Sequence, residues 1–183
     1  MDRKSFLHKV VALTAAPALL AACARSAESA DVIATAGAPA TGQPGVGRLV
    51  KPKAEWRRLL PPAAYTVLFE EGTERAGSSP LDRERRAGTF VCAACNLPLF
   101  ESAAKYDSGT GWPSFFRPIA GRVATKTDRL LFVPRTEYHC ARCGGHQGHV
   151  FDDGPRPTGQ RYCNNGVALA FVPTGTPLPA LRT

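Results

Sequence analysis

Two copies of one short cysteine pattern constrain this chain more than any other feature of its sequence. Residues 90–96 read FVCAACN and residues 138–144 read YHCARCG, so each copy is aromatic-x-Cys-Ala-x-Cys followed by Asn or Gly. Asn and Gly tolerate the left-handed backbone of a tight turn. Such a turn, here called a knuckle, aims two thiolates at one metal ion, and two knuckles supply the four ligands typical of structural zinc.

We therefore predict a closed zinc site made by the cysteines of both knuckles, which are Cys92, Cys95, Cys140 and Cys143. Two other uses of these cysteines stay open at this point. Each pair could close a local disulfide, or one pair could be redox-active, and an oxidising compartment would permit either. The repeated turn chemistry favours the metal, which would join two segments distant in sequence.

The first 22 residues have the composition of an export signal. Three basic residues precede an apolar run over residues 10–22 that is too short to cross a bilayer as a helix. The run ends in LAAC, which resembles a bacterial lipobox with Cys23 as the lipidated first residue of the mature protein. Residues 3–7, RKSFL, also resemble a twin-arginine signal with Lys in its second position. We expect an exported, membrane-anchored lipoprotein of the bacterial periplasm; a buried N-terminal helix is the alternative.

Composition divides the remainder of the chain into three parts. Residues 23–50 are rich in Ala, Gly, Ser, Thr and Pro and cannot bury enough apolar surface to fold alone, which predicts a flexible tether. Residues 51–174 are the predicted domain, and residues 175–183 are a Pro-rich segment expected to be a loose tail. One core of ordinary size suits 183 residues that are 44% hydrophobic.

The pattern within the domain changes from helical to β-type. Residues 55–60 predict a short helix, and a second helix runs from Pro62 in its first turn to about Glu70, where Gly72 stops it. Beyond Gly88, short β-type runs alternate with Gly, Pro and Asn, which predicts a mainly antiparallel β domain. The clearest of these runs are residues 89–91, 130–133 and 167–172.

The net charge of +8 would suit an acidic partner, yet the basic clusters are interrupted by acids and are interpreted as a solvated surface. The main rival function is an exported zinc-ribbon-like binding module without catalysis. Nucleic acid is not expected as a partner because an export signal argues against it. A zinc hydrolase is excluded, since four cysteine ligands leave the metal no open position for water.

One cysteine is left once Cys23 is assigned to the lipid and four others to the metal. This residue, Cys163, could be an inert buried thiol. Arg161 lies two residues before it and two asparagines follow it. Because cationic and hydrogen-bonding neighbours lower the pKa of a thiol, we predict that Cys163 is a nucleophile.

Several further blocks resemble the type B methionine sulfoxide reductases. They are GTER at 72–75, GTGWPSF at 109–115, RTE at 135–137, CARCGGHQGHVF at 140–151 and RYCNN at 161–165. The resemblance runs from about residue 51 to 172. It implies a β-tent of two antiparallel sheets with short N-terminal helices, one zinc ion on the four knuckle cysteines, and methionine R-sulfoxide, free or in a peptide, as the substrate.

The expected chemistry assigns a role to each side chain of the site. Attack by Cys163 on the sulfoxide sulfur yields methionine and a sulfenic acid on the cysteine. The departing oxygen needs a proton, so His146 and His149 are the candidate general acids, with a purely structural hydrogen bond as the alternative for either.

Three other residues complete the expected substrate site. Trp112, with Phe151 beside it, is expected to hold the methyl group and stabilise positive charge on sulfur; core packing is the alternative for Trp112. Asn165 is expected to orient a histidine or to hold the sulfoxide oxygen.

Regeneration of the thiol is expected to need an outside reductant. Many members of the family carry a resolving cysteine within the Gly-x-Gly-Trp block, where this chain has Thr110. We therefore expect a thioredoxin-like protein or a small thiol to reduce the sulfenic acid on Cys163. An unlipidated Cys23 on the flexible tether is the alternative partner.

Overall fold

The computed structural model describes residues 46–128 and 134–183. The predicted export signal, Cys23 and most of the tether therefore lie outside the described residues, as does the predicted strand at 130–133. In the part of the chain that is described, no helix has the length and apolar character needed to cross a membrane.

Two short helices open the domain, as the sequence predicts. Helix α1 spans Lys53–Leu59 and helix α2 spans Pro62–Glu70, with Pro62 in the first turn. Helix α2 ends where Glu71 adopts a left-handed backbone and the Gly72 amide donates to the Thr66 carbonyl. The helices bury one face each against the domain, and the ring of Trp56 stacks on that of Phe69 at 5.0 Å.

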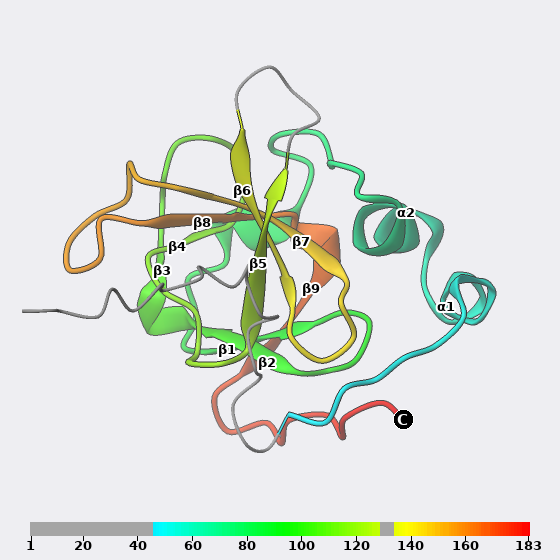
Figure 1. Cartoon of the computed structure of the whole chain (residues 1–183). Coiled ribbons are helices and arrows are strands. Elements are labelled where there is room, and N and C mark those ends of the chain that lie inside the picture. Colours follow the sequence, from blue (N-terminus) through cyan, green and yellow to red (C-terminus); the bar gives the residue numbers. More distant parts are fainter. Residues whose placement is uncertain (1–45, 129–133) are drawn as a thin grey trace, which may run out of the picture. The chain divides into compact units, whose positions relative to one another are not determined.

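Two antiparallel sheets make up the rest of the domain (Figure 1). The three-stranded sheet has the order β2 (Pro98–Glu101), β1 (Gly88–Cys92) and β9 (Leu169–Pro173). The six-stranded sheet has the order β3 (Lys105–Tyr106), β4 (Ser114–Phe115), β8 (Arg161–Asn164), β7 (His146–Phe151), β6 (Arg135–Cys140) and β5 (Val123–Asp128). Single 3₁₀ turns lie at Pro80–Arg83, Ser102–Ala104 and Gly166–Ala168. The predicted fold class is confirmed.

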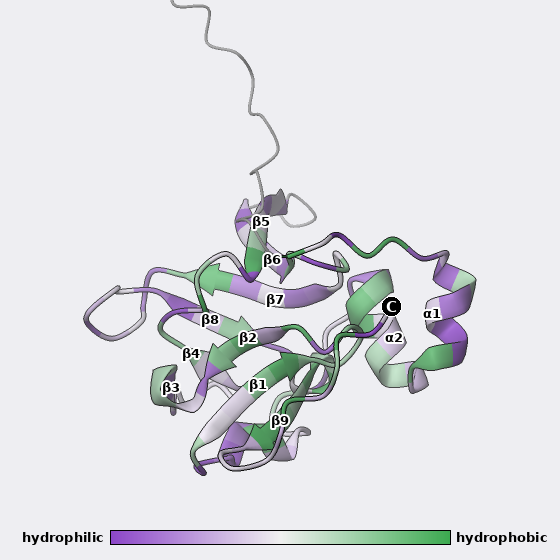
Figure 2. Ribbon diagram, turned by 90° about the horizontal axis from the view of Figure 1, so that it is seen from below, coloured by the Kyte–Doolittle hydropathy of each residue, from purple (hydrophilic) through white to green (hydrophobic). Residues whose placement is uncertain are grey.

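Aromatic side chains from both sheets form the centre of the core. Phe100 of β2 stacks on Phe115 of β4 with ring centroids 4.1 Å apart, and Phe90 of β1 meets Phe115 edge-on at 5.0 Å. Apolar residues are concentrated in β1, β2 and β9, and α2 is more hydrophobic than α1 (Figure 2). Because fully buried aromatic rings remove large apolar areas from water, this contact holds the two sheets together.

Both ends of the described domain are bonded more firmly than the sequence suggests. Leu49, within the predicted tether, donates from its amide to the Arg142 carbonyl at 2.8 Å. In the segment expected to be a loose tail, Arg182 donates to backbone carbonyls of the first knuckle, and Asn96 donates to the Ala180 carbonyl. Composition does not reveal these contacts, because most of them use backbone carbonyl groups of the knuckles as acceptors.

Strands β7 and β8 approach each other most closely at Gly148. A Cβ atom on Gly148 would lie 1.9 Å from the Cys163 carbonyl oxygen, far inside van der Waals contact. Gly148 pairs with Asn164, and the next residue, His149, pairs with Cys163. Only glycine therefore permits the register that places His149 opposite Cys163.

We expect Gly148→Ala to destabilise the domain by about 1–3 kcal/mol, because β8 must move away from β7 to admit the methyl group. Urea unfolding followed by circular dichroism measures this loss. Gly47→Ala is the matched control, since a Cβ atom there meets nothing within 4 Å. Equal stability of the two variants would contradict the close approach.

Candidate functional site

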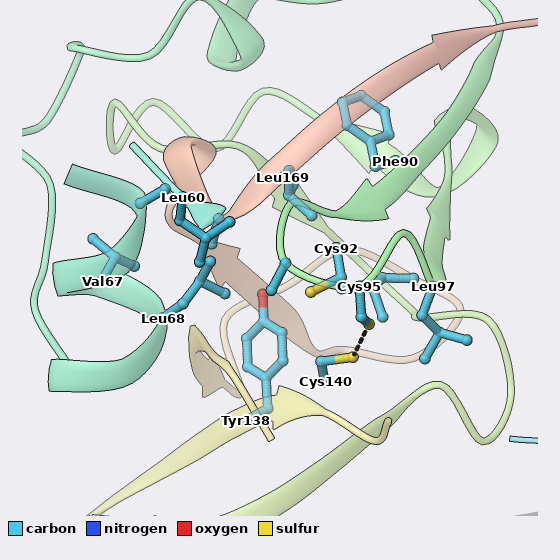
Figure 3. Packing of buried hydrophobic residues seen from close by; sticks show 14 of the residues in the cluster. Leu60, Val67, Leu68, Phe90, Cys92, Cys95, Leu97, Tyr138, Cys140 and Leu169 are labelled. Atoms are coloured by element: carbon cyan, nitrogen blue, oxygen red, sulfur yellow. Dashed lines mark hydrogen bonds between the residues drawn. The ribbon is translucent and has the colours of Figure 1, made fainter. Parts of the chain in front are cut away.

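The four knuckle cysteines converge on one point. All four Sγ atoms lie within 4.8 Å of one another, and the Sγ atoms of Cys92 and Cys143 are 3.7 Å apart. The Sγ atoms of Cys95 and Cys140 are 3.5 Å apart, with Cys92 close by (Figure 3). A tetrahedron of thiolates around zinc with bonds of about 2.3 Å has edges of about 3.8 Å. The cluster is therefore a possible metal site with the size and donor set that zinc requires.

The two knuckles have the same backbone geometry, as their matching sequences predict. In each, the residue after the second cysteine has a left-handed backbone, with φ of 62° at Asn96 and 74° at Gly144. Each then donates its amide to the carbonyl of the first cysteine at 2.9 Å. The repeated sequence pattern is thus a repeated turn.

Disulfides do not account for these cysteines in the structure. Every cysteine in the described ranges is free. The closest sulfur pair given above, at 3.5 Å, is well beyond the bond length of about 2.05 Å.

The thiols of the cluster influence one another's ionisation. Hydrogen bonding among them, foremost with Cys140, raises the pKa of Cys92 and lowers the pKa of Cys95. Because the cluster is buried, several negative charges on it would need a cation between them.

A separate cavity of about 140 Å³ contains most of the other predicted site residues. Its lining is Thr73, Trp112, Arg135, Gly148, His149, Phe151, Cys163, Asn164 and Asn165. Of the side chains predicted for the substrate site, only His146 is absent from this lining. A larger cavity of about 300 Å³ near Arg117 and Ile119 has no thiol or imidazole in its lining and cannot carry the same chemistry.

Cys163 lies half-buried on β8, opposite His149 of β7 and Ser114 of β4. Burial raises the pKa of its thiol above the ordinary value, although Arg161 and a hydrogen bond from Thr110 act in the opposite direction. The sequence-based expectation of a lowered pKa is therefore wrong in its net direction. The cationic neighbour is present, but the loss of solvent around the thiol outweighs it.

Arg161 is held rigidly beside the thiol. Its Nε and Nη2 atoms each donate to a carboxylate oxygen of Asp153 at 2.8 Å, and its guanidinium lies 4.2 Å from the centre of the Phe151 ring. A two-point bond of this kind fixes the guanidinium plane. Phe151 thereby gains a fixed position in the wall of the cavity.

The two predicted histidines have different surroundings. His149 lines the cavity, and its Nε2 lies 2.9 Å from a carboxylate oxygen of Asp128. His146 is buried behind it, with Nδ1 2.8 Å from the Glu137 carboxylate and the two imidazole rings 5.6 Å apart. Burial lowers the pKa of His149, against the raising influence of Asp128. Only His149 is placed to reach a ligand in the cavity.

Asn165 and Trp112 are both fixed by the backbone of Glu74. The Glu74 amide donates to the Asn165 side chain at 3.0 Å, and the indole Nε1 of Trp112 donates to the Glu74 carbonyl at 3.2 Å. The Glu74 carboxylate accepts from the amides of Gly166 and Val167. Asn165 also donates from its side chain to the Gln147 carbonyl, so both of these bonds join Asn165 to backbone groups and not to a histidine.

A buried hydrogen-bond chain connects the thiol cluster to β8. The side chain of Gln147 donates to Cys92 Sγ at 3.6 Å and accepts from Asn164 at 3.4 Å. Asn164 in turn accepts from the Tyr138 hydroxyl at 2.6 Å. Since Asn164 follows Cys163 directly, the cluster and the reactive thiol are parts of one framework.

Sequence reasoning missed Glu74, Asp128, Glu137 and Gln147 as members of this framework. Glu74, Glu137 and Gln147 lie inside the motif blocks, so their position near the predicted site residues was a usable signal. Asp128 lies outside every block. It meets His149 only through the pairing of β5 with β6 and of β6 with β7, which the sequence does not reveal.

The fold and its two sites define a class of protein, a β domain with a cluster of four thiols that could hold a metal and one separate thiol in a cavity with aromatic side chains in its wall. A family model described as the SelR domain matches residues 60–173. The chain therefore belongs to the SelR domain family.

Curated proteins named as peptide methionine sulfoxide reductases are similar to this chain. Peptide methionine sulfoxide reductase MsrB of Bradyrhizobium diazoefficiens is 50% identical over 127 residues, which is 69% of this chain and 91% of that protein. The Pseudomonas putida protein of the same name is 49% identical, covering 69% of this chain and 96% of the relative. Chloroplastic peptide methionine sulfoxide reductase B1 of Arabidopsis thaliana is 50% identical over 63% of this chain, which spans 57% of that longer protein. The family predicted from the motif blocks, and with it the oxidoreductase class, is confirmed.

Proposed function

We propose that this protein reduces methionine R-sulfoxide in peptides or proteins, with Cys163 as the nucleophile. The observation that carries the proposal is the meeting of Cys163, His149 and Trp112 in one cavity of about 140 Å³. A volume of this size suits a short, unbranched side chain. The names of the relatives indicate the reaction class. The resemblance of the motif blocks to the type B reductases indicates that the R epimer is the substrate.

The first step transfers oxygen from the substrate to the cysteine. The Cys163 thiolate attacks the sulfoxide sulfur, and His149 gives a proton to the sulfoxide oxygen. The attack forms a bond between the two sulfur atoms; the protonated oxygen then moves to the sulfur of Cys163 as this S–S bond and the S–O bond of the substrate break, which releases methionine and leaves a sulfenic acid on Cys163. Two electrons have passed from the thiol sulfur to the sulfoxide sulfur, so the step balances without another reactant.

Positive charge on the substrate sulfur is stabilised by the aromatic wall. The indole of Trp112 is oriented by its bond to the Glu74 carbonyl, and the ring of Phe151 is oriented by Arg161. Aromatic faces attract cationic groups and exclude water from the methyl group. Hydrolysis or hydration of the reacting centre is thereby avoided.

The protonation states of the acid and the nucleophile limit the rate. Burial raises the pKa of Cys163 and lowers the pKa of His149, so both groups favour their neutral forms. The reactive pair of thiolate and imidazolium is the minor form near neutral pH. Groups that stabilise either charge, such as Arg161 beside the thiol, therefore increase the active fraction.

Regeneration uses a thiol from outside the domain. Thr110 offers Cys163 a hydroxyl, and the remaining cysteines of the described residues belong to the metal cluster. The thiolate of a thioredoxin-like protein or a small thiol attacks the sulfenic sulfur and releases water, leaving a mixed disulfide. A second thiol then displaces Cys163 and restores it.

The four-cysteine cluster holds one structural zinc ion in this proposal. The metal supplies no open coordination position, so its role is to join the two knuckles and not to take part in oxygen transfer. Export to the periplasm and a lipid on Cys23 stay predictions from residues 1–23, which lie outside the described ranges. Within that proposal the substrates are oxidised proteins of the cell envelope, which the enzyme repairs.

We expect Cys163→Ser to retain one zinc per chain, whereas Cys92→Ser should lose the metal and unfold, because three remaining thiols cannot hold the knuckles together. Metal quantitation by mass spectrometry, with circular dichroism on the same samples, checks both results. Full zinc content in Cys92→Ser would overturn the structural role of the cluster.

The second test compares the two sulfoxide epimers. Dithiothreitol should support turnover of a peptide with methionine R-sulfoxide and not of the S epimer, and Cys163→Ser should lose all measurable turnover because no other group can accept the oxygen. Chromatography of the peptide product provides the measurement. A folded, zinc-loaded protein that is inactive on both epimers would instead support a binding module.

A further inference from the structure

We propose that Asp128 is a positioning residue of the reaction, which orients the ring of His149 and stabilises its protonated form. The inference rests on the proposed role of His149 and adds the residue through which that histidine is controlled. Asp128 lies outside every motif block. Its contacts and its burial support this role.

Asp128 is the last residue of β5, and its side chain is only 4% exposed. One carboxylate oxygen, Oδ2, lies 2.9 Å from His149 Nε2 and 2.6 Å from Arg135 Nη2. A charged group so buried needs a partner, and Arg135 supplies the opposite charge. Asp128 is therefore held in place from one side while it holds the imidazole from the other.

The contact decides which ring nitrogen can serve the substrate. Because Nε2 of His149 is taken by the carboxylate, Nδ1 is the nitrogen left for a ligand in the cavity that His149 lines. A carboxylate on the far nitrogen fixes both the tautomer and the ring orientation of a histidine. It also stabilises the imidazolium form that a general acid must adopt.

The other charged or titratable neighbours of His149 cannot replace this carboxylate. Arg135 of β6 and His146 of β7 both lower the pKa of His149. Glu137 of β6 pairs in register with His149, but its carboxylate contacts His146 and Lys126. Cys163 faces His149 from β8. Asp128 is thus the group that opposes the effect of burial on the His149 pKa and favours the protonated form that a general acid needs.

A structural role for Asp128 is the alternative, because its bond to Arg135 also joins β5 to β6. Asp128→Asn separates the two roles, since the amide fills the same space without the charge. The matched control is Glu71→Gln, which removes the exposed ion-pair partner of Lys126, a residue of the same strand as Asp128; Glu71 is not in the cavity lining. Unfolding by urea identifies any loss of stability in either variant.

We expect the pKa of His149 to fall by about one unit in Asp128→Asn, as removal of an opposite charge at this distance predicts. Proton NMR of the ring, assigned by loss of its signals in His149→Gln, gives this value directly. The reactive form needs His149 protonated and Cys163 ionised at once, and burial leaves His149 with the lower pKa. The value of kcat/KM therefore rises with pH up to the His149 pKa and is level between that pKa and the pKa of Cys163. A lower His149 pKa moves the rise to lower pH and reduces the level region about tenfold. Glu71→Gln should match wild type in both measurements.

An unchanged His149 pKa in a folded Asp128→Asn protein would overturn the inference, as would a loss of stability without a shift in the pH profile. The NMR titration needs no turnover. If the wild-type protein reduced neither epimer, the proposed function would fail, while a lowered pKa in the variant would still support the coupling of Asp128 to His149.

A second inference comes from different contacts, those between the knuckles and the two terminal segments. Arg182 donates from Nε to the Ala94 carbonyl at 2.6 Å and from its amide to the Cys95 carbonyl at 3.1 Å. Asn96 donates from its side chain to the Ala180 carbonyl at 2.8 Å. The first knuckle is thus tied at three points to residues 180–182, which we call the C-terminal strap.

The second knuckle is tied in the same manner from the other end of the domain. The Leu49 amide donates to the carbonyl of Arg142, which lies between Cys140 and Cys143. A bound metal can leave only if a knuckle opens, and opening moves the backbone that these bonds hold. We infer that the strap and the Leu49 contact slow the loss of metal from the cluster.

The test measures the rate of zinc transfer from the full chain to an excess of a coloured chelator. Arg182→Ala and Asn96→Gly should each release zinc several-fold faster than wild type, since glycine keeps the left-handed turn of Asn96 but removes its bond to the strap. Arg58→Ala, an exposed arginine on α1, is the control. Freshly loaded Arg182→Ala should keep wild-type activity. Release at the wild-type rate from both variants would overturn the inference, and a wild-type protein without zinc would overturn the metal site itself.

Discussion

The convergence of four thiols from two distant knuckles is the contact on which the remaining structure depends. One knuckle joins β1 to β2 in the smaller sheet, and the other joins β6 to β7 in the larger sheet. The proposed metal between them would link the two sheets through these four cysteines, three of which are buried. The bond from Gln147 to Cys92 then extends this fixed point to β8 and its reactive thiol.

The register between β7 and β8 brings the site residues of the two strands together. Gly148 lets β7 lie close to β8, and His149 consequently faces Cys163 across the pair. The charged groups that act on the pKa values of these two residues lie elsewhere. Asp128 of β5 raises the pKa of His149, and Arg161 at the start of β8 lowers the pKa of Cys163. Burial alone would leave both groups neutral, so the ion pairs around the cavity determine how much of the protein is in its reactive form.

The sequence predicted the helices, the fold class and the convergence of the knuckles, because each depends on local turn chemistry or on motif blocks. It placed Trp112, Phe151 and Cys163 in one site for the same reason. It did not reveal the inner position of His146 or the contact of Asp128 with His149, which follow from pairing between strands. The net direction of the Cys163 pKa shift was also missed, since burial cannot be read from neighbours in the chain.

The small cavity around Cys163 has a consequence for how the enzyme meets its two reactants. In the proposed reaction, the oxidised side chain and the thiol of the reductant must both reach the sulfur of Cys163 in one cavity of about 140 Å³. The Gly-x-Gly-Trp block has Thr110 in place of a partner thiol. In that proposal substrate and reductant exclude one another and alternate, which is the kinetic order known as ping-pong. In that regime the supply of reductant, and not the amount of damage, sets the pace of repair whenever oxidised protein is abundant.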